Sequence, residues 1–383
     1  MVLKEYSLGE LLKYEQPTKY IVSSTNYDDS YQTPVLTAGK SFVLGYTDER
    51  DGIYEKDDLP VIIFDDFTTS SQYVDFPFKV KSSAMKILTP NKDLVLPKYI
   101  YYRMQIIQFD HSTHKRYWIQ QYSKIKVSIP ELEEQKAIVK KIEELFSQLD
   151  NSEKELNTIN GQLKVYRQAV IKDAFSKINK YLELGSLIEK PRYGTSKKCT
   201  YEKKDESLEV YRIPNIQAHV GIISHDDIKY AEFNDSELAD LNLKENDLLL
   251  IRSNGSVSLV GRTAIVRKCD EKGTFAGYLI RLRLKDANCI AAKYLQYYFE
   301  SHEARVYIEK TAKSTSGVNN INSEEIKRMH IPWGDNELQN EVVAEIESKL
   351  STCDSIDKMI VDTLVRADVM RQSILKDAFE GRL

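Results

Sequence analysis

The feature that most constrains this chain is a long internal repeat. Residues 135–175 align with residues 339–379 without a gap, at a constant shift of 204 positions. Both copies contain an Arg-Gln pair and end in Lys-Asp-Ala-Phe, and an Ile-Pro pair precedes each copy. Chance similarity between two amphipathic helices does not explain so many identities at one spacing. The chain therefore contains a duplicated element.

Both copies predict long helices that pair as a coiled coil. Their apolar positions are spaced alternately by four and three residues, and neither copy contains proline. In the first copy the expected seam is Ile138, Ile142, Leu145, Leu149, Ser152, Leu156, Ile159, Leu163, Tyr166 and Val170. In the second copy it is Val342, Ile346, Lys349, Cys353, Ile356, Ile360, Thr363, Ala367, Met370 and Ile374. A stripe of this length needs a partner, and the simplest partner is the other copy.

The segments that precede the two helices also share landmarks. The run Leu8–Leu11 resembles Leu184–Leu187, and the Lys-Tyr run at 98–102 resembles the one at 293–298. Between these landmarks the two segments differ strongly. We therefore expect a duplicated scaffold with diverged interiors, divided into a globule (1–128), a helical segment (129–180), a second globule (181–332) and a second helical segment (333–383).

Each globule is expected to be a mixture of helices and strands. Short β-rich runs are found at 60–64, 247–251 and 263–266, and residues 99–108 and 293–309 are predicted to be helices. The expected fold class is α+β, with two mixed α/β globules joined by two long helices in a pseudo-twofold repeat.

Charge and cysteine content limit the classes of function. The net charge is −4, but residues 333–383 alone hold 6 basic and 11 acidic side chains, so the rest of the chain is nearly neutral. A neutral domain can still present a basic face to nucleic acid. The acidic last segment is expected to face protein or to point away from DNA.

The sequence predicts neither a membrane protein nor a secreted one. No apolar run is long enough for a membrane span. The four cysteines, at 199, 269, 289 and 353, are widely spaced, which argues against a zinc site or a disulfide framework and favours the reducing cytoplasm. His111 and His114 lack further ligands nearby, so no metal site is expected.

Enzyme motifs are missing from the sequence. There is no Gly-x-Gly-x-x-Gly fingerprint, no complete P-loop, no Gly-x-Ser-x-Gly elbow and no Asn-Pro-Pro or Asp-Pro-Pro loop of amino-methyltransferases. Asp65 and Asp66 follow an apolar strand and could bind magnesium. Without a third acid nearby, they are expected to form a solvated strand end.

Both globules instead carry polar, glycine-bearing loops. Arg, Asn and Gln can read base edges, whereas Ser, Thr and Lys can hold phosphates, although such loops can also simply face water. The candidates in the first globule are Thr25, Asn26, Thr37, Lys40, Thr68, Thr69, His114, Lys115 and Arg116. Those in the second globule are Thr195, Ser196, Lys197, Asn215, Gln217, Arg252, Ser253, Asn254, Arg262, Thr315, Ser316, Asn319 and Asn320. Tyr117 and Trp118 could be base-stacking side chains or core anchors.

These features together point to one family. The motifs that indicate this family are the two Ile-Pro-to-Lys-Asp-Ala-Phe repeats, the Leu-Gly-x-Leu openings, and the runs 33–39, 64–68, 247–255, 259–262 and 375–383. With them the full chain resembles the specificity subunit of type I restriction-modification systems. The resemblance implies that two target recognition domains each read half of a split site in double-stranded DNA. The two helices would pack antiparallel and set the unspecified spacer.

The resemblance also implies partners that carry the chemistry. Two modification subunits would hold S-adenosylmethionine and methylate a flipped adenine, and two restriction subunits would use ATP and Mg²⁺. The chain itself would be non-catalytic and hold no cofactor. The helix residues expected to bind partners are Arg167, Gln168, Lys172, Asp173, Phe175, Arg371, Gln372, Lys376, Asp377 and Phe379.

Three other interpretations are retained. The chain could be the recognition subunit of a type IIB-like restriction-modification system. It could be a coiled-coil scaffold that does not bind DNA. It could also be a nuclease that uses Asp65 or Asp66.

Overall fold

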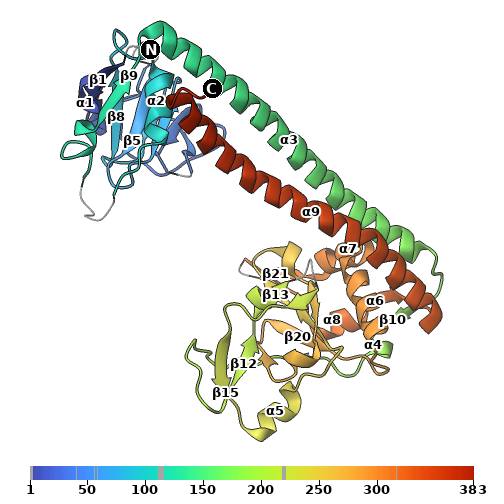
Figure 1. Cartoon of the computed structure of the whole chain (residues 1–383). Coiled ribbons are helices and arrows are strands. Elements are labelled where there is room, and N and C mark those ends of the chain that lie inside the picture. Colours follow the sequence, from blue (N-terminus) through green and yellow to red (C-terminus); the bar gives the residue numbers. More distant parts are fainter. Residues whose placement is uncertain are drawn as a thin grey trace. The chain divides into compact units, whose positions relative to one another are not determined.

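A computed structural model of the chain describes residues 3–39, 41–55, 57, 59–110, 116–217, 221–315 and 317–383. Its contacts divide the chain into two compact units, one made of residues 1–156 and 361–383 and the other of residues 157–360. Each unit contains one globule together with a part of each long helix (Figure 1).

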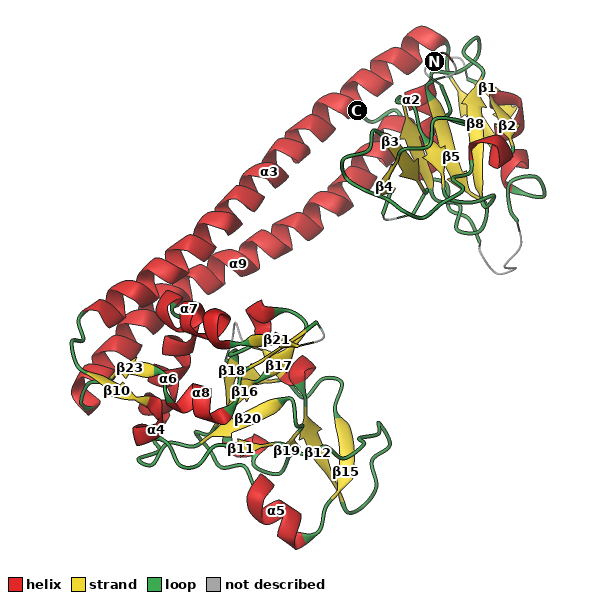
Figure 2. Ribbon diagram, turned by 180° about the vertical axis from the view of Figure 1, so that it is seen from behind, coloured by secondary structure: helices red, strands yellow, loops and turns green. Residues whose placement is uncertain are grey.

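The globule of the first unit is built on three antiparallel or mixed sheets (Figure 2). The four-stranded sheet, in the order β2-β8-β5-β6, consists of Leu12–Glu15, Met85–Pro90, Val61–Asp65 and Ser71–Val74. The three-stranded sheet β4-β3-β7 consists of Val43–Thr47, Thr33–Leu36 and Lys79–Val80, and the pair β1-β9 of Lys4–Ser7 and Lys126–Ile129. The short helices are α1 (Leu8–Leu11), η1 (Pro17–Tyr20), α2 (Pro97–Gln105) and η3 (Tyr122–Lys124).

Strand β5 is buried on both faces because each face packs against a different cluster of apolar side chains. Ile62 and Phe64 point to one core, where Trp118 and Tyr122 pack against Phe64 with ring centroids 5.2 and 4.9 Å away. Val61 and Ile63 point to the other core. A strand that is buried on both faces carries apolar residues at successive positions, and such a run predicted the strand at 60–64.

The globule of the second unit contains more strands. A six-stranded sheet has the order β11-β20-β16-β18-β14-β13, with strands Arg192–Tyr193, Leu279–Leu282, Leu248–Ile251, Thr263–Ile265, Ile222–Ile223 and Ile216–Gln217. A three-stranded sheet β15-β12-β19 consists of Lys229–Glu232, Ser207–Tyr211 and Thr274–Phe275. A second three-stranded sheet β17-β22-β21 consists of Ser253–Asn254, Val318–Asn320 and Lys313–Thr315, and the pair β10-β23 of Tyr181–Glu183 and His330–Pro332.

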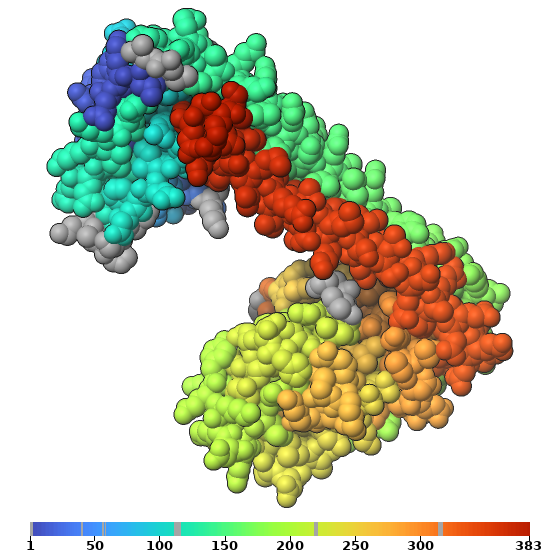
Figure 3. Space-filling model, in the orientation of Figure 1, coloured from blue at the N-terminus to red at the C-terminus, as the bar shows by residue number. Residues whose placement is uncertain are grey.

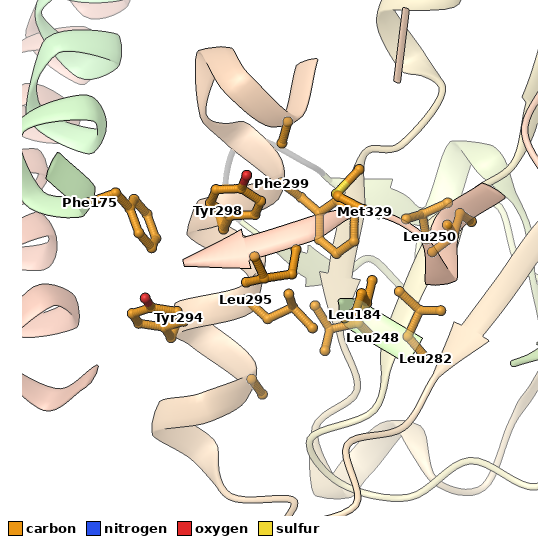
Figure 4. Close-up of a cluster of buried hydrophobic side chains, with 14 of the residues drawn as sticks. Phe175, Leu184, Leu248, Leu250, Leu282, Tyr294, Leu295, Tyr298, Phe299 and Met329 are labelled. Carbon is orange, nitrogen blue, oxygen red and sulfur yellow. The ribbon is translucent and has the colours of Figure 1, made fainter. Parts of the chain in front are cut away.

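The helices of this globule pack on one face of the six-stranded sheet, except α5, whose Leu241 packs against the core on the other face. They are α4 (Leu184–Leu187), α5 (Asp235–Leu241), α6 (Cys289–Glu300), α7 (His302–Thr311) and α8 (Ser323–Lys327), with short turns η4 (Ile213–Asn215), η5 (Val257–Leu259) and η6 (Lys268–Asp270). Figure 4 shows the core, in which Leu295 and Phe299 of α6 lie between the sheet residues and Phe175. The α6 face is apolar at every turn, so burying it against the sheet gives the largest core cluster of the chain.

The two long helices are α3 (Leu132–Ser176) and α9 (Asn336–Phe379). In the second unit, Arg167 pairs with Asp354 and Lys177 pairs with Glu345, so numbers rise along α3 as they fall along α9. In the first unit, Arg371 of α9 pairs with Asp150 of α3 in the same sense. The helices are therefore antiparallel, and the expected fold class with its internal repeat is confirmed.

The predicted seam is wrong at five positions, which are exposed: Ser152, Ile159, Tyr166, Thr363 and Met370. Tyr166 and Met370 are about half exposed, at 48% and 52%. The next residues, Arg167 and Arg371, turn inward instead, because each guanidinium reaches two carboxylates on the facing helix. Ion pairing, which the apolar pattern does not encode, thus moves the stripe by one residue.

The duplicated scaffold extends into both globules. Strands β1 and β9 pair in the first unit as β10 and β23 do in the second, and α1 and α4 follow the first strand of each pair. Lys98 pairs with Glu143 and Lys293 pairs with Glu347, and these two glutamates lie at equivalent positions of the repeat. The predicted landmarks therefore make equivalent contacts.

The predicted strands at 60–64, 247–251 and 263–266 correspond to β5, β16 and β18. The single helix expected at 293–309 is in fact two helices, α6 and α7, which break at Ser301. The Ser301 hydroxyl accepts a hydrogen bond from the amide of Ala304 and so starts a new helix. In the described part of the chain, every helix is too short or too polar to cross a membrane.

Candidate nucleic-acid interface

A polar cavity of about 690 Å³ opens on the second globule. Its lining includes six of the residues that the sequence nominated, namely Thr195, Ser196, Lys197, Arg252, Ser253 and Asn320. The other lining residues are Cys199, Arg212, Ile213, Pro214, Lys229, Ala276, Gly277 and Tyr278. Residues from distant parts of the sequence thus meet at one surface feature.

Strand pairing brings these residues together. In the small sheet, β17 pairs with β22 so that Ser253 faces Asn320 and Asn254 faces Asn319. On the opposite side, an isolated parallel bridge joins Thr195 to Ala276, and the amide of Gly277 donates to the carbonyl of Thr195 over 2.7 Å. The backbone, rather than the side chains, therefore fixes the positions of both walls.

Four cationic side chains surround the cavity: Lys197, Arg212, Lys229 and Arg252. Lys197 donates to Glu237 over 2.6 Å, and this hydrogen bond lowers the pKa of that carboxyl. Arg212 pairs with Asp227 over 2.8 Å, whereas Lys229 lies over the ring of Tyr201 at 4.6 Å. Carboxylates thus offset the charges of Lys197 and Arg212, so Lys229 and Arg252 supply the positive charge that would attract a polyanion.

Arg252 is the side chain best prepared to read a base. Its guanidinium stacks on the ring of Tyr193 at 4.9 Å, and its Nη1 donates to the carbonyl of Gly277 over 3.1 Å. Stacking holds the planar fork in one orientation, which suits bidentate bonding to a guanine edge. Within the described part of the chain, the Nε atoms of Arg252 and Arg212 are buried and have no hydrogen-bond partner.

Two nominated residues of the second globule have structural roles instead. Asn215 is 0% exposed; its amide donates to the carbonyls of Ser224 and Asp226, and its oxygen accepts from the amide of Arg212. The prediction that Asn215 contacts DNA is therefore wrong, because all of its polar atoms are used inside the globule. Arg262 is paired with Glu300 and donates to the carbonyl of Ser258, so its charge is already neutralised.

Among the remaining candidates of this globule, the side chains of Gln217, Asn254 and Asn319 are described, whereas those of Thr315 and Ser316 are not. Asn319 donates to the carbonyl of Gly255 over 2.9 Å and ties the loop after β17 to β22. Gln217 is half-buried in β13, and Asn254 accepts from the amide of Ser256. Thr315 ends β21, where only its backbone is described, and Ser316 lies outside the described residues.

In the first globule, one group of candidates is brought together at the β5–β6 turn. The carbonyl and carboxylate of Asp66 accept hydrogen bonds from the amides of Tyr117 and Trp118. This contact places the exposed Arg116 beside the turn that carries Thr68 and Thr69. Thr69 has a φ of 57°, a left-handed conformation that closes the turn.

The other candidates of this globule are not brought to that turn. Thr37 lies in the turn between β3 and β4, whereas Thr25 and Asn26 lie beyond the opposite end of β4, in a loop held by Glu49. Lys40, His114 and Lys115 lie outside the described residues. The candidates that the structure describes in the first globule therefore lie on separate polar surfaces.

Four side chains for which the sequence allowed two roles, Asp65, Asp66, Tyr117 and Trp118, have structural roles in the first globule. Tyr117 and Trp118 are buried in the core. Asp66 is 1% exposed and lies 3.6 Å from Lys86 Nζ, so the expectation of a solvated strand end is wrong for this residue. Asp65 accepts hydrogen bonds from the amides of Phe67 and Thr68 and shapes the turn.

The nominated helix residues mostly hold the chain together. Arg167 and Arg371 form intrachain ion pairs, Gln168 donates to the carbonyl of Glu300, and Asp377 pairs with Arg382. Phe175 packs between Tyr294 and Tyr298, and Phe379 packs against Tyr99. Figure 3 shows the end of α9, in dark red, lying against the first globule. Gln372 and Lys376 remain exposed, and Lys172 and Asp173 line a cavity of about 480 Å³ on the second unit.

Sequence reasoning missed two sets of surface residues. Arg212, Lys229 and Tyr278 line the polar cavity, although none of them was among the candidates named from the sequence. On α9, the side chains of Val361, Val365 and Val369 are 59%, 60% and 66% exposed. The three valines are spaced by four residues, which places them on one side of a helix. The sequence did not distinguish them from the coiled-coil seam, whose apolar residues have a similar spacing.

The comparisons with known proteins agree with this geometry. Residues 3–161 match the family described as the type I restriction modification DNA specificity domain. Residues 3–161 therefore belong to this family of specificity domains. It is 46% identical over 174 residues to the type I restriction enzyme EcoR124I/EcoR124II specificity subunit of Escherichia coli, covering 43% of each chain.

A second relative extends the match along the chain. It is the type I restriction enzyme EcoKI specificity subunit of Escherichia coli strain K12, 32% identical over 281 residues, which covers 68% of this chain and 58% of the relative. The matches thus span roughly half the length of these two relatives. A chain of a solved structure described as "Structural basis underlying complex assembly and conformational transition of the type I R-M system" aligns over 100% of this chain and 98% of its own, with a TM-score of 0.70. At 14% identity, this match shows a shared fold.

Proposed function

We propose that this chain reads DNA sequence for a type I restriction-modification complex, each globule recognising one half of a bipartite site. The observation that carries the proposal is the polar cavity of the second globule. Lysine, arginine, asparagine, serine and threonine side chains converge there from two three-stranded sheets and from loops, with Arg252 over the ring of Tyr193. These residue types suit phosphate contact and base-edge readout.

The chemistry of the complex would reside in other subunits. Modification subunits would bind S-adenosylmethionine and methylate adenine, and restriction subunits would use ATP and Mg²⁺. Two copies of each are proposed, because the duplicated scaffold presents each helical contact twice. The chain itself would be the non-catalytic reader.

A docking surface for the modification subunit is proposed on α9. Val361, Val365 and Val369 form a stripe along one side of the helix, with more than half of each side chain exposed. Apolar side chains in a row on a surface helix favour burial by a partner. The equivalent residues of α3 are Asn157, Gly161 and Val165, so the stripe would serve only one of the two proposed modification subunits.

A methylome tests the proposal. The chain is expressed with its cognate modification subunit in a host free of DNA methylation, and N6-methyladenine is mapped by single-molecule sequencing. A motif with two short defined halves around a fixed run of unspecified bases is expected. Absence of methylation, despite an intact complex and a modification subunit active with another specificity subunit, would favour a scaffold.

The cavity is tested in the same experiment with Arg252→Ala and, as a matched control, Arg328→Ala. Arg328 follows α8 and does not line the cavity. The Arg252 variant should relax one half of the motif and leave the other unchanged. Equal loss of both halves with the complex intact would show that the cavity does not read sequence. Magnesium-dependent cutting of DNA by the chain alone would instead favour the nuclease alternative.

A further inference from the structure

A second cluster of chemically reactive side chains lies in the second globule, apart from the polar cavity. It consists of His225, Cys269 and Asp270, with Glu209 behind the histidine. The donor atoms of the first three residues all lie within 4.8 Å of one another. Neither DNA recognition nor helix packing accounts for this convergence.

The contacts within the cluster point to one place. His225 Nε2 lies 2.7 Å from Asp270 Oδ1, and Cys269 Sγ lies 3.5 Å from the same oxygen. Nitrogen, sulfur and oxygen ligands around a tetrahedral zinc ion lie about 3.4–3.7 Å apart, given their usual bond lengths. The Sγ–Oδ1 separation already fits, and the Nε2–Oδ1 separation must open by less than about 1 Å.

Each potential ligand is held in place by a second group. Glu209 Oε2 lies 3.0 Å from His225 Nδ1 and leaves Nε2 facing the cluster. Tyr211 donates to the same Glu209 oxygen over 3.2 Å, and Lys272 lies 3.5 Å from the other. A carboxylate on the far nitrogen of a histidine is the usual arrangement behind a metal-bound imidazole.

Asp270 is held in a comparable way. It is 0% exposed, and its Oδ2 accepts hydrogen bonds from the backbone amide and Nε of Arg267 over 2.8 and 3.0 Å. Its Oδ1 then faces the histidine and the thiol. The guanidinium of Arg267 also approaches Oδ1, at 3.2 Å, and would compete with a cation at that oxygen. The carboxylates of Asp270 and Glu209, together with a Cys269 thiolate, supply negative charge that offsets both Arg267 and a bound metal cation.

We propose that His225, Cys269 and Asp270 bind a zinc ion, with Glu209 as the group that orients the histidine. Sulfur and imidazole ligands select zinc over magnesium or calcium, which prefer oxygen. His225 and Cys269 are partly open to solvent, so water takes the fourth position.

The proposed site joins parts of two sheets. Glu209 belongs to β12 of the three-stranded sheet, His225 follows β14 of the six-stranded sheet, and η6 connects β18 to β19. The role is therefore structural. An ion bound there fixes β12 and its neighbour β15, which carries Lys229 of the cavity wall.

The test uses the full chain, stripped of metal by a chelator and kept reduced. Titration calorimetry with Zn²⁺ should show one site per chain. Titration with Co²⁺ should give the visible bands of a tetrahedral ion together with a thiolate-to-cobalt charge-transfer band. Cys269→Ser should abolish the charge-transfer band, and His225→Ala should weaken Zn²⁺ binding by more than tenfold.

Matched controls are available in the same globule. Cys289→Ser and His302→Ala change exposed residues outside the cluster and should leave metal binding unchanged. If His225→Ala does not fold, as judged by circular dichroism, the exposed Cys269→Ser still decides the outcome. Absence of stoichiometric binding, or a charge-transfer band that survives Cys269→Ser, would overturn the proposal.

Discussion

Arg167 of α3 and Asp354 of α9 form an ion pair with 2.6 Å between Nη2 and Oδ1, and Asp357 accepts from the same nitrogen over 2.7 Å. The first unit repeats this arrangement at positions shifted by 204, where Arg371 contacts Asp150 and Glu153. Each arginine is about three-quarters buried at the helix pair. The duplication has thus preserved a pairing as well as a sequence.

These arginines should contribute measurably to the stability of the unit that contains them. Arg167→Ala is expected to lower the free energy of unfolding by about 1 kcal/mol, because a partly buried arginine loses two carboxylate partners. Arg371→Ala should have a similar effect. A double-mutant cycle with Asp354→Ala, followed by urea denaturation, measures the coupling, and a coupling near zero would mean that the pair is only a surface contact.

The two repeated phenylalanines should differ in importance. Phe175 is 5% exposed and packs between Tyr294 and Tyr298, with ring centroids 5.0 and 5.4 Å away. Phe379 is only half-buried, against Tyr99 at 5.2 Å. Phe175→Ala should therefore cost about 3–4 kcal/mol and Phe379→Ala less. Thermal unfolding of both variants compares them; equal losses would contradict the burial argument.

Glu49 should make the first globule sensitive to acid. Burial acts to raise its pKa, but hydrogen bonds from Ser23, Lys79 and the amide of Ser24 outweigh this and lower the pKa to about 2. In the unfolded chain the carboxyl has its ordinary value of 4.5. Its contribution to stability is then present above pH 4.5 and is lost as the pH falls toward 2.

Glu49→Gln provides the measurement. It should lower stability at pH 7 by about 2 kcal/mol and flatten the acid limb of the stability curve. The same change should loosen the loop that carries Thr25 and Asn26, because Ser23 and Ser24 then donate to a neutral amide oxygen instead of a carboxylate. Hydrogen exchange at these amides reports the loosening. An unchanged acid limb would show that Glu49 is not held as described.

Lysine and arginine of the cavity should affect DNA binding in different ways. Lys229→Ala is expected to weaken binding to all sequences and to reduce the salt slope by about one. Arg252→Ala should cost about 1–3 kcal/mol at one base position only. Fluorescence anisotropy at several salt concentrations, with cognate and altered duplexes, separates the two effects. The opposite assignment of the two residues would require a different orientation of DNA.

Asn215→Ala should change stability rather than sequence preference. The substitution removes three buried hydrogen bonds and leaves the carbonyls of Ser224 and Asp226 without this donor. A loss of about 2–4 kcal/mol is expected, measured by denaturant unfolding. If the folded variant instead showed altered DNA preference at full stability, the burial of Asn215 would not describe the working molecule.

The sequence by itself determined the duplicated scaffold. The identities at one constant shift fixed the two long helices, and the landmarks near Leu8, Lys98, Leu184 and Lys293 fixed how each globule meets them. Continuous apolar runs gave β5 and β16, because strands buried on both faces carry apolar residues at every position. Such signals are local, and local pattern is what a sequence records directly.

Only the tertiary structure decided which polar residues are available to contact DNA. Asn215 and Arg252 look equally suited to base contact in the sequence, yet one is enclosed by its own hydrogen bonds and the other stacks at a cavity. Tyr166 fits the heptad pattern, but Arg167 takes the inward position, because it forms ion pairs with two carboxylates of the facing helix. These partners lie 187 and 190 residues away in the sequence. Contacts at such separations depend on the folded path of the chain, and periodicity does not contain them.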